Sequence, residues 1–169
     1  ITRMEAQIAK APKEIVPLLD TLQANWYWQY YTWNRWRVMQ RTATAAAPGP
    51  DITTWDLPRL FAEIDKQFGK ALSASAVLKT TPVAMFDALL NKGTLPDTYR
   101  PTLYDFIAQE ALTFYTSAEQ AAARPQDAFE ITAESDIFAP VDRFMAWAPE
   151  TTDTDSPTLK AVRLYQDLL

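Results

Sequence analysis

The chain contains no cysteine and no histidine, and it has only three glycines. The first two absences exclude a disulfide framework, a zinc site built on Cys or His ligands, and Ser-His-Asp or Cys-His catalysis within this chain. The shortage of glycine disfavours a strand-rich fold, because tight β-turns use glycine for positive φ angles. No apolar run is long enough to cross a bilayer, so we predict no membrane span.

The overall composition, with 48% hydrophobic and 22% charged residues, is typical of a globular protein. A length of 169 residues suits one domain with a sizeable core, and we predict a single all-helical domain over residues 1–169. The net charge of −5 argues against a polyanionic partner, so we expect no nucleic-acid binding. Because the sequence starts at Ile1 and ends on Leu169 within an amphipathic pattern, we expect it to be a fragment of a longer chain.

An aromatic segment over residues 25–42 dominates the sequence. Seven of the eleven residues over 26–36 are Trp or Tyr. On a helix, one stripe gathers the apolar residues Ile15, Leu19, Leu22, Trp26, Tyr30 and Trp33. Each buried ring removes roughly 150–250 Å² from water, which favours a core position. We therefore interpret Trp26, Tyr30 and Trp33 as a core-forming stripe rather than a binding site.

Two other interpretations of the aromatic segment stay open. Exposed Trp and Tyr rings could form a platform on which sugars stack. Alternatively, Arg35, Arg37 and Arg41 alternate with Trp33 and Trp36, a pattern found where proteins bind single-stranded nucleic acid. Three arginines in a net acidic chain are few for that role, so the glycan platform is the stronger alternative.

Helical periodicity and capping residues recur along the rest of the chain and predict an all-α fold. We expect roughly seven short-to-medium helices packed as helical hairpins, in a bundle or a short solenoid-like array. The predicted helices cover residues 3–10, 12–42, 57–72, 82–90, 103–115, 140–147 and 157–168. The segment 121–139 lacks periodicity, and irregular segments of that length are uncommon in compact domains, so we expect it to pack on neighbouring domains.

Acidic residues offer the only candidates for chemistry, and none of them forms a complete motif. Asp153 and Asp155 resemble the start of a calcium loop, but Thr158 and Leu164 stand where glycine and a bidentate glutamate are required. The acid pairs that a glycosidase could use are Asp51 with Asp56 and Glu63 with Asp65. Each pair fits a turn, a helix cap or a solvated helix face equally well. We therefore predict no enzyme activity, no catalytic residue, no metal site and no cofactor.

Several strings in the sequence carry a family resemblance. They are WNRW running into QRT over 33–42, DITTWDL over 51–57, LPDTYRPTLYDFIA over 95–108 and continuing to Phe114, TTDT after Trp147, and the YQDLL ending. Together they resemble the N-terminal helical region of large bacterial alpha-2-macroglobulin-like proteins, from about Leu22 onward. These strings have no known catalytic role, so the resemblance suggests a family without supplying a mechanism.

The resemblance implies a helical module that precedes β-sandwich macroglobulin domains in an envelope-associated protein that entraps proteases. Many members carry a Cys-Gly-Glu-Gln thioester in a distant domain, but this chain has no cysteine and no functional residue can be carried over. We therefore expect a non-enzymatic scaffold or docking module in the periplasm or at the outer membrane. Its partners would be other domains of the parent protein, and proteases only through that parent. The alternative is a helical glycan-binding module of an outer-membrane lipoprotein.

Overall fold

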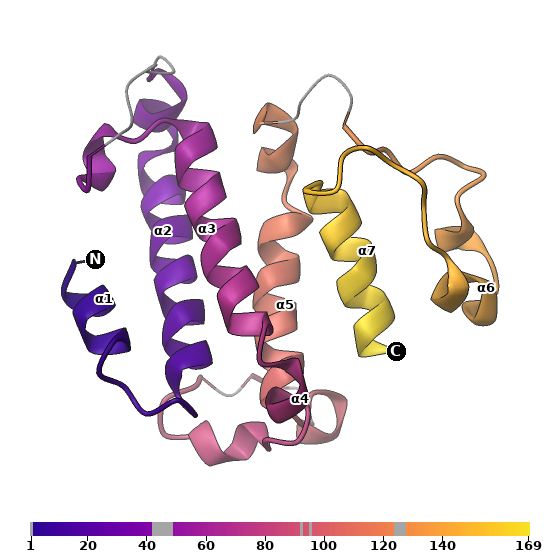
Figure 1. Ribbon diagram of the computed structural model, residues 1–169, viewed down its shortest axis with the longest axis horizontal. Helices are drawn as coiled ribbons and strands as arrows, with labels where there is room; N and C mark the ends of the chain where they lie inside the picture. The colour runs from indigo at the N-terminus through magenta and orange to yellow at the C-terminus, as the bar shows by residue number, and fades with distance from the viewer. Residues whose placement is uncertain (1, 42–48, 92, 95, 124–127) are drawn as a thin grey trace. The chain divides into compact units, whose positions relative to one another are not determined.

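The computed structural model describes residues 2–41, 49–91, 93–94, 96–123 and 128–169 (Figure 1). The described residues form seven α-helices and several short 3₁₀ helices, and they contain no β-sheet. The α-helices are α1 (Thr2–Ile8), α2 (Val16–Met39), α3 (Leu57–Leu72), α4 (Ser75–Leu78), α5 (Leu103–Tyr115), α6 (Val141–Ala146) and α7 (Pro157–Leu168). The predicted all-α fold is confirmed.

Contacts among the residues divide the chain into two compact units, Ile1–Glu110 and Ala111–Leu169. We call them unit 1 and unit 2 and describe each separately. The boundary falls inside α5, which begins in unit 1 and ends in unit 2. The single domain predicted over 1–169 stays a prediction.

The core of unit 1 lies between α2 and α3, which pack side by side (Figure 1). Asp56 begins α3, because its Oδ1 accepts a hydrogen bond from Arg59 N at 2.9 Å, and Pro58 follows in the first turn. The buried apolar face of α3 then recurs at helical spacing: Leu57, Leu60, Phe61, Ile64, Phe68 and Ala71. From α2, the ring of Tyr31 meets the edge of Phe61 at a centroid distance of 5.0 Å. This aromatic contact and the aliphatic rows around it hold the two helices together.

The predicted core stripe on α2 is wrong. Trp26 and Trp33 are 49% and 81% exposed, and Tyr30 is only half-buried. The buried side of α2 is the opposite one, where Leu18, Ala24, Tyr27, Tyr31 and Val38 lie. Because α2 is apolar nearly all round, its periodicity does not distinguish the two sides. The side that packs on α3 includes the fully buried Ala24 and Tyr31, and the exposed side has Trp26 and Trp33.

The segment predicted as a helix over 82–90 is also different. It contains only a 3₁₀ helix, Val83–Phe86. An isolated antiparallel bridge pairs Pro82 with Thr102 and ties the segment to the start of α5. In this bridge Val83 N donates to Pro101 O at 3.0 Å, and Leu103 N donates to Thr81 O at 2.8 Å.

Unit 2 is built on the end of α5 and on α7. Ser156 begins α7 by accepting a hydrogen bond from Leu159 N at 3.4 Å. Gln166 of α7 donates to the carbonyl oxygens of Phe144 and Trp147 at 2.7 and 2.9 Å, which fixes the end of α6. The buried apolar residues of the unit are Ala111, Leu112, Phe114, Tyr115, Phe144, Leu159, Ala161, Val162 and Leu164.

The segment predicted to be irregular, 121–139, includes residues 124–127, which lie outside the described part of the chain. The described remainder has a 3₁₀ helix over Asp136–Phe138. Phe129 N donates to Asp153 Oδ2 at 3.0 Å, so this aspartate fastens the segment to the loop before α7. Asp153 therefore has a structural contact at the position where the sequence suggested a calcium loop. The predicted packing of 121–139 on neighbouring domains stays a prediction.

Candidate functional site

The acid pairs suggested by the sequence are engaged in local structure. Asp51 Oδ1 accepts hydrogen bonds from Thr53 N and Thr53 Oγ1 at 2.9 and 2.8 Å, and these bonds hold the pKa of Asp51 below its usual value. Its sequence partner Asp56 caps α3. Both carboxylates therefore stabilise the chain reversal before α3, and their hydrogen bonds are those of a turn and a cap.

Glu63 is the buried member of the second pair. Its Oε1 accepts from Gln67 Nε2 at 2.6 Å and lies 3.2 Å from Lys66 Nζ, while Oε2 lies 3.4 Å from Arg59 Nη2. Neighbours on one helix thus satisfy the carboxylate. In the described part of the chain, no cluster of three or more acidic residues is placed to hold a metal ion. None of the described helices is long and apolar enough to cross a membrane.

Several large side chains on α2 are exposed. We define the tryptophan face as Leu22, Trp26, Trp33 and Trp36, which are 37%, 49%, 81% and 76% exposed. Their spacings of four, seven and three residues, with Gln29 at the intervening position, are those of residues that one helix presents to another. The structure thus places three residues of the predicted stripe, Leu22, Trp26 and Trp33, in a solvent-facing row, and Trp36 extends it.

The C-terminal part of the tryptophan face differs from the rest in its positive charge and in its backbone geometry. No Asp or Glu occurs over residues 21–41, whereas Arg35 and Arg37 lie near the end of α2 and Arg41 follows it. At Asn34 the backbone leaves helical geometry, with φ −117° and ψ 17°. The side chain of Asn34 donates from Nδ2 to Tyr30 O at 2.9 Å, which holds this kink. The helical turn that contains Trp36 therefore follows directly after this kink.

Arg41 joins two of the strings that carry the family resemblance. Its Nη1 donates to Trp55 O at 2.6 Å, and its Nη2 donates to the Tyr30 hydroxyl at 3.2 Å. The indole of Trp55 in turn stacks on Tyr27 at 5.5 Å and donates to Gly49 O at 2.8 Å. Arg41 and Trp55, one from each string, therefore tie the end of α2 to the segment before α3.

A third string has a similar role at the start of α5. Asp105 Oδ2 accepts from Thr102 N and Thr102 Oγ1, both at 2.8 Å, and Thr102 Oγ1 accepts from Asp105 N at 3.2 Å. This reciprocal pair is a capping box with aspartate in the place of glutamate. The PTLYD string thus determines where α5 begins.

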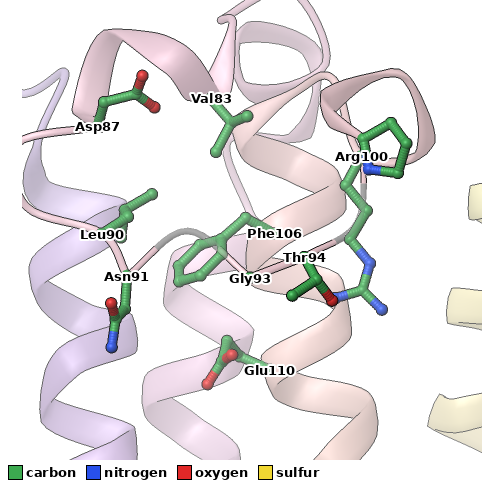
Figure 2. Close-up of a pocket in the computed structure, with 10 residues that line it drawn as sticks. Val83, Asp87, Leu90, Asn91, Gly93, Thr94, Arg100, Phe106 and Glu110 are labelled. Atoms are coloured by element: carbon green, nitrogen blue, oxygen red, sulfur yellow. The ribbon is translucent and has the colours of Figure 1, made fainter.

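Unit 1 also contains a cavity of about 410 Å³ near the start of α5 (Figure 2). Its lining includes the apolar side chains of Val83, Leu90, Pro96 and Phe106 and the charged side chains of Asp87, Arg100 and Glu110. Figure 2 shows Phe106 in the middle of the view, with the Arg100 guanidinium to one side and the Glu110 carboxylate below it. Asn25 Nδ2 of α2 donates to Glu110 Oε2 at 2.8 Å, so the carboxylate is held in one orientation.

The sequence did not point to this cavity. Asn25 and Glu110 are 85 residues apart, and the other charged members come from the connection between α4 and α5. The one local signal is Glu110 itself, an acid placed next to the buried residues Ala111 and Leu112 of α5.

The buried carboxyl of Asp20 gives a pH-dependent prediction. Burial raises the pKa of Asp20, and the positive charge of Lys70 on α3 opposes this shift. The folded protein then holds the proton more tightly than the unfolded chain, so the fold loses stability as the pH rises through the folded pKa. We expect Asp20→Asn to unfold at a higher urea concentration than the wild type at neutral pH, with the difference vanishing near about pH 3.

Glu14→Gln, at an exposed acid just before α2, is the matched control and should show no such gain. An Asp20→Asn advantage of equal size at both pH values would mean that the gain does not come from the charge.

No family model, curated protein or solved structure was found to match the chain. The resemblance to alpha-2-macroglobulin-like proteins therefore rests on the strings in the sequence.

Proposed function

We propose that this chain is a non-enzymatic helical docking module and that the tryptophan face of α2 is its docking surface. The observation that carries the proposal is the 81% and 76% exposure of the Trp33 and Trp36 side chains. Large exposed aromatic surfaces mark interaction sites, and Trp is enriched among the residues that contribute most to binding. The opposite side of α2 already holds the core, so the tryptophan face is available to a partner.

The arrangement favours a protein partner over a sugar. Leu22 extends the tryptophan face by a turn at helical spacing, and an aliphatic side chain there suits a helix packing along α2. A sugar platform would need rings side by side in a groove with polar groups around them. The exposed indoles still support a helical glycan-binding module of an outer-membrane lipoprotein as the second candidate, because exposed Trp rings are what such a module uses.

The partner we propose is another domain of an alpha-2-macroglobulin-like parent in the periplasm or at the outer membrane, with proteases reached only through that parent. The strings over 33–57 and 95–114 support this part of the proposal. Their residues make loop-closing and capping contacts, as a scaffold requires. The acids that could have served catalysis are engaged in similar contacts, which supports the absence of enzyme activity.

Trp33→Ala combined with Trp36→Ala should abolish docking and leave the fold intact. We expect at least about a hundredfold weaker binding to the adjoining domains of the parent protein, because two exposed Trp anchors are lost. The melting temperature should fall only slightly, since exposed side chains contribute little to stability. Biolayer interferometry with those domains immobilised, together with far-UV circular dichroism, measures both quantities.

Phe138→Ala is the matched control, because Phe138 is 72% exposed but lies in unit 2. This variant should bind as the wild type does. Binding to a glycan array that the double variant loses would support the second candidate. If the double variant binds the adjoining domains like the wild type, the tryptophan face is not the docking surface.

A further inference from the structure

We propose that the cavity of unit 1 binds an α-ammonium group next to a carbonyl and an apolar side chain, as in a free amino acid or the first residue of a peptide. The volume of about 410 Å³ lies within the range of small-ligand sites. None of the residues that define the tryptophan face lines this cavity. The proposal is therefore independent of the docking function.

Glu110 supplies the site for the ammonium group. Its Oε2 accepts from Asn25 Nδ2 at 2.8 Å, which orients the carboxylate, and the Glu110 side chain lines the cavity. Asp87 adds a second carboxylate to the lining. A primary ammonium carries three N–H donors, and its hydrogen bonds to carboxylates are among the strong ones.

Arg100 supplies the complementary contact for the carbonyl or carboxylate. Its guanidinium lies on another side of the cavity from Phe106 (Figure 2) and offers donors in a fixed plane. Among the described residues, the structure records no ion pair between Arg100 and Glu110 within 4.0 Å. Arg100 and Glu110 therefore make no direct ion pair. A ligand can place its ammonium group at Glu110 and its carbonyl group at Arg100.

The apolar part of the lining accounts for the side chain of the ligand. Val83, Leu90 and Phe106 are half-buried, so each still has surface to cover. Leucine and phenylalanine side chains would cover this surface and remove it from water. The three kinds of contact together require an amine, a carbonyl and an apolar group in one small ligand.

Isothermal titration of the whole chain with four probes tests this assignment. The probes are L-leucine, the tripeptide Leu-Gly-Gly, N-acetyl-L-leucine, which lacks the ammonium, and isoamylamine, which lacks the carboxylate. We expect L-leucine or the tripeptide to bind, and the two deficient probes to bind at least about tenfold more weakly. Tighter binding of the tripeptide would identify a peptide N-terminus as the ligand, and tighter binding of leucine would identify the free amino acid.

Glu110→Gln keeps an acceptor for Asn25 and should remove the preference for leucine over N-acetyl-leucine. Arg100→Gln should remove the preference for leucine over isoamylamine. Glu134→Gln, at an exposed acid in unit 2, is the control and should bind as the wild type does. The proposal is overturned if neither leucine nor the tripeptide binds at millimolar concentration, or if Glu110→Gln keeps the full preference.

Discussion

Tyr31→Ala is expected to lower the free energy of unfolding by on the order of 3–5 kcal/mol, whereas Trp33→Ala should change it by less than about 1 kcal/mol. The two residues are neighbours on α2 but lie on opposite sides. Tyr31 is fully buried, stacks on Trp28 at 5.3 Å and meets Phe61 at 5.0 Å, so its removal leaves a cavity in the core. Trp33 is mostly in solvent. Urea denaturation followed by circular dichroism measures both changes.

Tyr31→Phe serves as the control, because it keeps the ring that fills the core. It should lose much less stability than Tyr31→Ala. A larger loss of stability for Trp33→Ala than for Tyr31→Ala would contradict this assignment. It would show that the side of α2 with Trp33 is the buried one, as the periodicity of the sequence predicts.

Arg41→Met should cost about 1.5–3 kcal/mol, the range for hydrogen bonds made by a charged group. The guanidinium donates to Trp55 O and to the Tyr30 hydroxyl, and no methionine atom can replace these donors. We expect the loss to be concentrated in the connection before α3, so amide hydrogens over 52–55 should exchange faster. Hydrogen exchange read by mass spectrometry, with urea denaturation beside it, measures both effects.

Arg37→Met is the matched control, because Arg37 is exposed on the same helix. It should leave both quantities close to those of the wild type. Equal losses for the two variants would mean that the positive charge of α2, and not the contact with Trp55, accounts for the effect.

The sequence predicted the helices where capping and periodicity agree. On α3, Asp56 and Pro58 mark the start, and the apolar residues through Phe68 keep one side, so the bounds and the buried face both follow. On α2, apolar residues occupy nearly every direction around the helix. The choice of buried side then depends on which residues fit α3, and that information is not local to α2.

The two candidate surfaces differ in how far the sequence could reveal them. The tryptophan face was visible as a row of aromatic residues, but their exposure became known only from the packing of Tyr27 and Tyr31. The cavity depends on the contact between Asn25 and Glu110 and on the position of Arg100. These residues come from separate segments, and single-sequence patterns carry no signal for such long-range contacts.

Residues 21–41, which contain no Asp or Glu, make the charge distribution along the chain uneven. The whole chain has a net charge of −5, yet residues 21–41 contain three arginines and no acid. An acidic partner would be repelled by the net charge of the chain and attracted toward the arginines at this end of α2. Its association rate should therefore fall as ionic strength rises, since such attraction acts over only about 8–10 Å at ordinary salt concentrations. The Trp side chains beside the arginines would then determine how long the partner stays.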